Sequence, residues 1–206
     1  MKLALAGAIA AIVALAVTVA VVLHDRAEVA AGPSSGKFRG IEEPPGIMLP
    51  AFTLKSYDGR VVKASDLRGK IAIVTFLDTK CKEACPIVAS VAAAAVDALT
   101  PSERLDVVAV AITSDPRVDT PAAIRAFLGR RHALRRIDYL IGPISRLKRI
   151  WRSFLVLSSF DSGDANVHSA PVRVYSRGGE WLATEHVGVD LTSANLVHDV
   201  RLAMRR

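Results

Sequence analysis

The chain is poor in cysteine, and this shortage excludes one class of protein. Only two of its 206 residues are cysteines, too few for the disulfide scaffold of a small secreted domain. These two, Cys81 and Cys85, lie only four positions apart, so a bridge between them would close a small loop and stabilise the fold little. We therefore expect the pair to serve chemistry, not structure.

Acidic residues are also in short supply, 20 against 27 lysines and arginines, which gives a net charge of +7. The basic residues include pairs such as Arg130/Arg131 and Arg135/Arg136, with no aromatic residues interleaved. We interpret the excess as a solvated basic face, with docking on an acidic partner or on anionic lipid headgroups as the alternative. Nucleic acid is not expected as a partner, because of the location predicted next.

Charge is absent altogether from the apolar segment of residues 3–23. At roughly 1.5 Å per residue this run is long enough to cross a hydrocarbon core of ~30 Å, so residues 1–24 are predicted to form one transmembrane helix. The alternative is a signal peptide cleaved near Ala31. Lys2 favours a cytoplasmic N-terminus, which puts the bulk of the chain on the extracytoplasmic side of a bacterial cytoplasmic membrane.

The rest of the chain has the size and composition of one domain, and no internal repeat is evident. Residues 25–48 are rich in Gly, Pro, Ser and charge, and are predicted to form a flexible linker. Residues 49–206 would then be the globular domain, because 51% of the whole chain is apolar, enough for one core of ordinary size.

The order of predicted elements in this domain indicates an α/β fold. A hairpin around Asp58-Gly59 comes first, followed by a buried strand at 70–77, a helix at 84–99 and a second buried strand at 105–112. The remaining predicted elements are helices at 120–130 and 145–151, a hairpin of strands 172–175 and 181–186, and a last helix at 193–204. This order is that of a thioredoxin-like fold with an N-terminal β-hairpin.

Both cysteines fall between the first buried strand and the helix that follows it, where an α/β sheet exposes its sites. With Cys85 in the first helical turn and Cys81 just before it, the two sulfurs can converge on one point. The helix N-terminus, Lys80 and Lys82 favour the thiolate form, while Glu83 opposes it. Such a pair can form a disulfide or hold one metal ion, and a structural role for two incidental cysteines is the plain alternative.

Two thiolates alone are an incomplete metal site, although soft Cu(I) accepts two or three ligands. Of five histidines, His168 ends a Gly/Asp-rich loop directly before a strand, from which it can reach the cysteines. The residues alone leave its role open. The other four are interpreted as surface or structural residues, namely His24, His132, His186 and His198.

Several blocks from about Pro50 to the C-terminus together resemble the Sco/SenC family of copper proteins. The matching blocks are Phe52-Thr53-Leu54 with Asp58-Gly59, Leu67-Arg68-Gly69-Lys70, Cys81-x-x-x-Cys85-Pro86, the run from Ser114-Asp115-Pro116 to Asp119-Thr120-Pro121, and His168-Ser169-Ala170. The resemblance implies a thioredoxin-fold copper chaperone that assists assembly of the copper A centre of cytochrome c oxidase.

The resemblance carries copper ligation to Cys81, Cys85 and His168, with the metal as Cu(I) or Cu(II). It implies two partners, the copper-receiving oxidase subunit and a thiol-disulfide reductant. The family pattern has Pro after the first cysteine and Asp before the histidine, where this chain has Lys82 and Val167. The missing Asp removes one group that could orient the imidazole, and Asp78 is a candidate to supply charge instead.

Other functions remain as alternatives to a copper chaperone, which would not be a turnover enzyme. The main one is an extracytoplasmic thiol-disulfide oxidoreductase, with Cys81 and Cys85 as the redox-active pair and His168 as a bystander. A peroxidase of related fold and a noncatalytic membrane scaffold are further alternatives without independent support. The C-x-x-x-C spacing favours the metal, because thioredoxin-like redox motifs have C-x-x-C.

Overall fold

A computed structural model describes residues 36–206 of the chain, and the folded unit in it spans Lys37–Arg206. The predicted membrane segment therefore lies outside the described residues. Within them, no helix combines the length and the hydropathy needed to cross a bilayer.

A single eight-stranded sheet forms the centre of this unit, with strand order β1-β8-β7-β4-β5-β6-β2-β3. The strands β4 (Ile71–Leu77), β5 (Val107–Thr113) and β6 (Asp138–Ile141) run parallel to one another. All other pairings are antiparallel, and they involve β1 (Ile41–Glu42), β2 (Thr53–Ser56), β3 (Val61–Lys63), β7 (Val172–Tyr175) and β8 (Trp181–Glu185).

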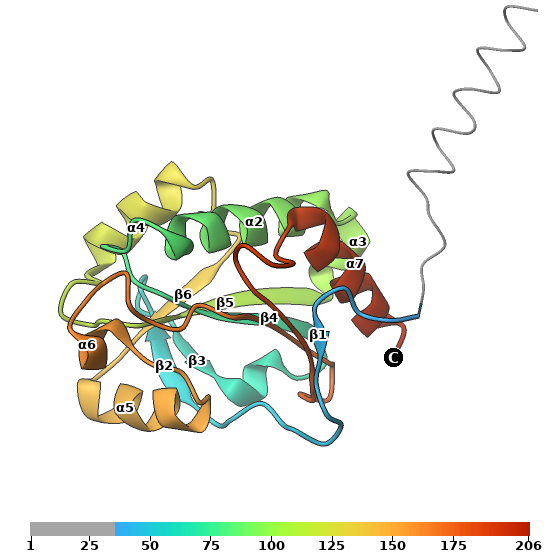
Figure 1. Ribbon diagram of the computed structural model, residues 1–206, viewed down its shortest axis with the longest axis horizontal. Helices are drawn as coiled ribbons and strands as arrows, with labels where there is room; N and C mark the ends of the chain where they lie inside the picture. The colour runs from blue at the N-terminus through green and yellow to red at the C-terminus, as the bar shows by residue number, and fades with distance from the viewer. Residues whose placement is uncertain (1–35) are drawn as a thin grey trace, which may run out of the picture. The chain divides into compact units, whose positions relative to one another are not determined.

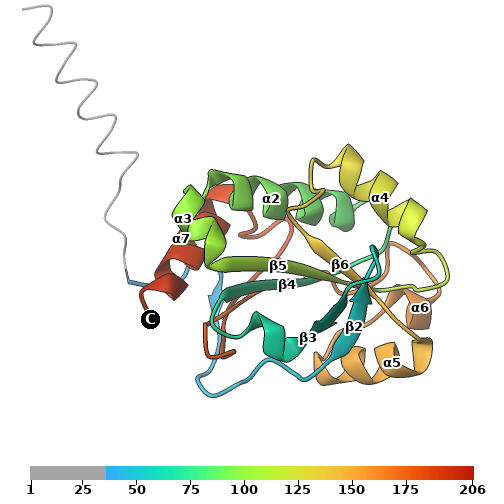
Figure 2. The same cartoon turned by 180° about the vertical axis from the view of Figure 1, so that it is seen from behind.

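Helices cover both faces of the sheet (Figures 1 and 2). One face carries α2 (Ala84–Ala98), α3 (Pro101–Leu105), α4 (Pro121–Arg130) and α7 (Ser193–Met204). The other carries α5 (Ile144–Ser153) and the one-turn helix α6 (Ser159–Ser162), and a short 3-10 helix, η1 (Ala64–Leu67), follows β3.

The central strand β4 is buried along its whole length because its side chains belong to two hydrophobic cores, one on each face of the sheet. Its alternate residues Ile71, Ile73 and Leu77 pack with α2, α4 and α7, while Val74 and Phe76 pack with α5 on the opposite face. This explains the continuous apolar run in the sequence, which is typical of a strand covered on both faces. It also fixes the end of β4, and therefore the start of the cysteine segment, between two packed layers.

The predicted thioredoxin-like α/β order with its N-terminal hairpin is present. The hairpin β2–β3 turns at Gly59, whose φ of +96° suits the Asp-Gly signal. Thr120 caps α4 through its side chain, which accepts the Ala123 N–H. Strand β5 begins two residues later than expected, because Leu105 ends helix α3 instead.

The folded unit extends further towards the N-terminus than residue 49, the expected start of the domain. Phe38 joins the core formed with α2 and α7, and β1 pairs with β8. The carboxylate of Asp199 on α7 accepts the backbone N–H groups of Arg39 and Gly40. Residues 37–48, assigned to the linker by composition, thus form a strap along the sheet edge, because partners distant in sequence satisfy their backbone.

Candidate metal centre

The two cysteines lie at the junction of β4 and α2, as the position of the motif indicates. Cys85 is in the first turn of α2 and Cys81 precedes the helix, so the backbone N–H of Cys85 donates to the Sγ of Cys81 at 3.4 Å. The N–H of Asp78 donates in turn to Cys85 Sγ at 3.3 Å. Both side chains are nearly inaccessible, with exposed fractions of 4% for Cys81 and 0% for Cys85. Neither forms a disulfide.

His168 faces this pair from the loop before β7. Its Nε2 lies 3.1 Å from Cys85 Sγ, and the three donor atoms of Cys81, Cys85 and His168 all lie within 4.8 Å of one another. Among the described residues this is the one group of three or more Cys, His, Asp or Glu side chains close enough to share a metal ion. His132, His186 and His198 are not members of this group, and His24 precedes the described residues.

The orientation of the imidazole is set by a backbone carbonyl. His168 Nδ1 lies 3.0 Å from the Ser169 oxygen, and a carbonyl can only accept, so Nδ1 carries a proton. The lone pair of a neutral imidazole is then on Nε2, which points at the sulfurs. Metal-binding histidines are usually fixed in this way by a partner on the other nitrogen. The Ser169 carbonyl therefore orients the imidazole, a role that an Asp at position 167 could have filled.

The pKa values of the two cysteines are shifted in opposite directions. The pKa of Cys81 is lowered to about 3, first by the hydrogen bond from the Cys85 thiol, then by His168 and backbone N–H groups, which together outweigh burial. The pKa of Cys85 is raised, first because its thiol donates a hydrogen bond to Cys81 and then because it is buried. Burial opposes the charge on His168, but the contacts with Cys81 and the Ser169 carbonyl outweigh it and raise the pKa of His168.

These causes differ in part from those expected from sequence. The helix N-terminus contributes, through the N–H groups of Glu83 and Cys85 that face Cys81, whereas Lys80 and Lys82 are not among the groups that shift the thiol most. A thiol and an imidazole beside Cys81 do more than two solvated ammonium groups, because hydrogen bonds act at contact distance and surface charges are screened.

Polar side chains hold the histidine loop against the cysteine segment. Asp78 is buried, and its carboxylate accepts the Ser159 hydroxyl at 2.6 Å and the Lys80 N–H at 2.7 Å. Asn166 Oδ1 accepts the N–H of Lys82 at 2.9 Å. Asp78, considered from sequence only as a source of charge, therefore also joins α6 to the cysteine segment.

Asp119 and Tyr139 are two functional candidates that the sequence reasoning missed. Thr120 caps α4, so Asp119 is free for another role, and Asp119 Oδ1 accepts the N–H of Thr79 at 2.9 Å. The Tyr139 hydroxyl, from β6, lies 2.7 Å from Asp119 Oδ2. Neither residue could be found from the sequence, because the burial of Asp119 is a property of the fold and the strand β6 that carries Tyr139 was not predicted.

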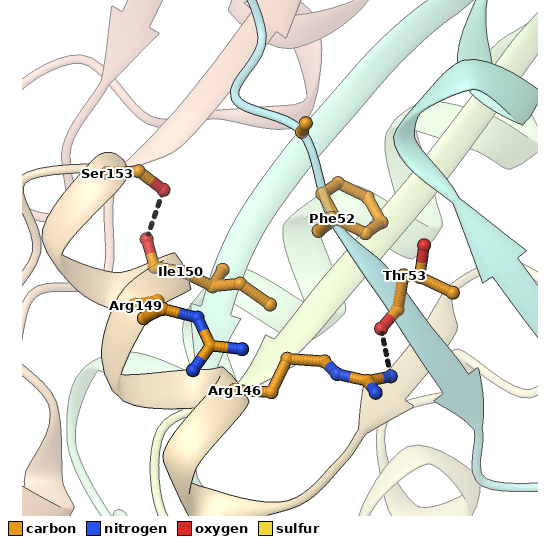
Figure 3. Close-up of a pocket in the computed structure, with 7 residues that line it drawn as sticks. Phe52, Thr53, Arg146, Arg149, Ile150 and Ser153 are labelled. Carbon is orange, nitrogen blue, oxygen red and sulfur yellow. Dashed lines mark hydrogen bonds between the residues drawn. The ribbon is translucent and has the colours of Figure 1, made fainter.

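A separate groove, whose lining includes none of the three candidate ligands, lies between α5 and the start of β2 (Figure 3). It encloses about 660 Å³, and the guanidinium groups of Arg146 and Arg149 face it. Arg146 donates to the Thr53 carbonyl at 2.9 Å, and Arg149 to the Ser145 carbonyl at 3.1 Å. The groove places part of the predicted basic face on α5.

Comparison with known proteins identifies the class. The fold is thioredoxin-like, with a Cys-Cys-His group at the end of its central strand, and residues 42–204 match the SCO1/SenC family. The chain belongs to this family.

Two relatives indicate how far the chain has diverged from characterised members. A SCO2-like protein of Rickettsia typhi is 24% identical over 157 residues, which cover 73% of this chain and 75% of the relative. The mitochondrial SCO1 homolog 1 of Arabidopsis thaliana is 33% identical over 125 residues, 61% of this chain and 34% of the plant protein.

Solved structures share the fold of this chain. A SCO1/SenC family lipoprotein of Bacillus anthracis superposes with a TM-score of 0.65 at 23% identity, covering 79% of this chain and 99% of that one. Arabidopsis thaliana ScoI with copper bound gives 0.63 at 25% identity, covering 77% and 99%. BsSco, described as a cytochrome c oxidase assembly protein with a disulfide switch, gives 0.64 at 24% identity, covering 79% and 96%.

Proposed function

We propose that this protein is a copper chaperone that binds Cu(I) or Cu(II) through Cys81, Cys85 and His168. The observation that carries the proposal is the convergence of two sulfurs and the free Nε2 of His168 within 4.8 Å, with Nδ1 turned away to Ser169. Thiolate and imidazole together are the donor types that copper prefers. In the plant relative with the same fold, copper is bound.

The difference between the pKa values of Cys81 and Cys85 suits the binding of one copper ion. Cys81 is already a thiolate at neutral pH and offers the first ligand, while Cys85 releases its proton when the metal arrives. His168 Nε2, 3.1 Å from Cys85 Sγ, is placed to receive that proton or to donate its lone pair to copper. Copper is the cargo here, and it leaves by exchange of these ligands for those of a recipient.

The recipient we propose is the copper A subunit of cytochrome c oxidase. Support comes from the family and from BsSco, which is an oxidase assembly protein. The proposed location is the extracytoplasmic side of a bacterial cytoplasmic membrane, with residues 1–24 as anchor. A solved structure with the same fold is that of a SCO1/SenC family lipoprotein of Bacillus anthracis, and this supports attachment to a membrane. Sizing the mature protein in the membrane fraction tests whether the segment is retained.

A thiol-disulfide oxidoreductase is the second candidate, favoured by the thiolate of Cys81 beside a protonated Cys85. In that reaction Cys81 attacks a partner disulfide and releases one partner thiolate, and Cys85 then attacks Cys81 and releases the second. The partner is reduced and the pair becomes a disulfide. The exposed fraction of Cys81, only 4%, does not separate the two candidates, because a partner disulfide, a reductant and a copper recipient all need access to this sulfur. A thiol-disulfide reductant remains a proposed partner, since copper binding needs reduced sulfurs.

Copper binding by the reduced full-length protein in detergent tests the proposal. We expect one ion per chain, with weaker binding in His168→Ala and none in the double variant Cys81→Ser/Cys85→Ser. The control is His198→Gln, on α7, which should bind as the wild type does. Absence of copper binding in the reduced protein, together with turnover of a disulfide substrate, would establish the oxidoreductase instead.

A further inference from the structure

Beneath the cysteine segment lies a buried hydrogen-bond cluster that the copper ligands do not include. Its members are the Thr113 hydroxyl at the end of β5, the Asp119 carboxyl, the Tyr139 hydroxyl on β6 and the Leu77 carbonyl at the end of β4. Asp119 and Tyr139 have exposed fractions of 2% and 0%, so water does not complete their hydrogen bonds.

The cluster contains three short contacts between oxygen atoms. Asp119 Oδ2 lies 2.6 Å from Thr113 Oγ1 and 2.7 Å from the Tyr139 hydroxyl, which in turn lies 2.8 Å from the Leu77 oxygen. Each contact needs one proton. Threonine and tyrosine supply one each, and a carbonyl supplies none. An ionised Asp119 leaves one contact without a proton, whereas a protonated Asp119 completes all three.

With Asp119 protonated, each hydroxyl in the cluster donates one hydrogen bond to the next oxygen in the series. Thr113 donates to Asp119 Oδ2, the acid O–H donates to the Tyr139 oxygen, and Tyr139 donates to the Leu77 carbonyl. The other oxygen, Oδ1, accepts the N–H of Thr79. The cluster therefore holds the backbone on both sides of Asp78, which lies three residues before the first cysteine.

We propose that Asp119 is a proton-dependent positioning residue, whose protonated carboxyl holds the Leu77–Thr79 turn and with it the cysteine segment. When Asp119 ionises, the Tyr139 hydroxyl turns its proton to the carboxylate, and the Leu77 carbonyl loses that donor. Leu77 keeps the Ser114 N–H at 2.7 Å, so the turn loosens without unfolding. The effect on copper rests on the proposed function, whereas the proton on Asp119 does not.

The surroundings of Asp119 favour this titration. Burial raises the pKa of Asp119 to about 6, against the hydrogen bonds from Thr113, Thr79 and Tyr139 that lower it. Tyr139 is fully protonated, since burial and the neighbouring charge of Asp119 raise its pKa well above the usual value. Asp78 and Cys85 are the other titratable groups that act on Tyr139, and Lys55, Tyr57 and Arg146 share a pocket with Asp119.

The substitution Asp119→Asn imitates the protonated acid toward Thr79 and Tyr139, because an amide offers an oxygen acceptor to the Thr79 N–H and an N–H donor to the Tyr139 oxygen. The Thr113 hydroxyl donates to the acid in the wild type and must accept from the amide instead. Infrared difference spectra of the copper-free protein should show a protonated carboxyl band that disappears as pH rises through about 6 in the wild type. The band should be absent from Asp119→Asn and unchanged in Asp115→Asn, the matched control from the same segment. No such band, or an identical one in Asp119→Asn, would overturn the proposal.

The copper readout separates positioning from a purely structural role. Below pH 6 the wild type and Asp119→Asn should bind copper equally, and at pH 8 the variant should bind roughly two- to tenfold more tightly, the worth of one hydrogen bond. A constant ratio across pH would refute proton-dependent positioning. If neither protein binds copper, the chaperone proposal fails, while the infrared result still decides the state of Asp119. Circular dichroism of Asp119→Asn checks that the variant is folded. If it is not, the pH at which the wild-type carboxyl band is lost decides, because the pKa of Asp119 is about 6 and that of Glu185, another buried acid, is about 9.

Discussion

The Ser169 carbonyl decides which nitrogen of His168 is available to the cysteines. It holds the proton on Nδ1, and Nε2 is left 3.1 Å from Cys85 Sγ. A backbone carbonyl is present whatever the side chain at position 169, and for this reason the loss of Asp at position 167 does not leave the imidazole unoriented. The same arrangement couples the titrations of His168 and Cys81.

Removing His168 should weaken the thiolate of Cys81. With its raised pKa, the imidazole can carry a second proton on Nε2, and its hydrogen bond to Cys81 in that form is one of the causes that lower the pKa of Cys81 to about 3. The thiolate is favoured at any pH above that value. In His168→Ala the apparent pKa should therefore rise, and the ultraviolet absorbance of the thiolate should fade at a higher pH than in the wild type. Lys82→Ala is the control, with no change expected. Equal midpoints in wild type and His168→Ala would show that the imidazole does not act on the sulfur.

At the scale of residues, the sequence predicts Cys81, Cys85 and His168 but not their supports. The cysteines stand out because they are the only two and fall at a strand-helix junction. Asp119 and Ser159 give no such signal, since Asp and Ser are common in turns and their partners are 40 and 81 residues away. Contacts at that separation are a property of the fold, and a single sequence does not reveal them.

Among the elements, the strap of residues 37–48 shows how closely β1 packs on the rest of the sheet. A Cβ atom at Gly40 would lie 2.7 Å from the Thr184 oxygen on β8 and 2.9 Å from Glu185 Cγ. Neither neighbour is the end of a flexible chain, because one is backbone and the other side chain is fully buried. Gly40 is therefore needed for this close approach.

Gly40→Ala should separate the strap from β8. We expect a loss of about 1–3 kcal/mol in the free energy of unfolding, as for other overpacked sites, measured by urea denaturation. Gly178→Ala, in the β7–β8 turn, is the matched control, because its Cβ would meet only Ser176 Oγ at 3.7 Å. The assignment of the strap to the folded unit fails if the two variants are equally stable.

Long periodic elements are predicted well, and short ones unevenly, since the β7–β8 hairpin has almost the expected bounds while other short elements were missed. The helix α7 has the expected bounds, and β4 and α2 differ from them by one residue each, because an apolar run and an apolar helix face are visible locally. The four-residue strand β6 was missed, since it follows an arginine-rich turn in which Arg135 has a φ of +62°. Helix α3 was also missed, although Thr100 and Glu103 form a capping box.

For the molecule as a whole, Glu185 is a buried acid that acts on stability. Its exposed fraction is 0%, and neither carboxyl oxygen has a hydrogen-bond partner within the described residues. Burial, followed by repulsion from Asp199 and Asp190, raises the pKa of Glu185 to about 9. The folded protein therefore holds a proton that the unfolded chain releases near its ordinary pKa of 4.5.

Because the folded state binds the extra proton, Glu185 lowers stability as pH rises from about 4.5 to about 9. In Glu185→Gln this loss should be absent. At pH 5 the melting temperatures of the two proteins should be similar, and at pH 8 the variant should melt higher, by roughly 4–8 °C for a gain of about 2 kcal/mol. Scanning calorimetry at both pH values measures the difference. A gap that does not widen between pH 5 and pH 8 would show that Glu185 is not protonated in the fold.

The donors of the candidate metal centre come from two segments, and Cys85 and His168 are 83 residues apart in sequence. An ion bound by both segments would be a reversible crosslink that closes a loop of the chain, as a disulfide does. This crosslink would be lost whenever the ion is released. The histidine loop would then gain freedom at each delivery. We expect limited proteolysis between residues 161 and 168 to be slow in the copper-loaded protein and fast after chelation, so that cleavage of this loop reports on the cargo.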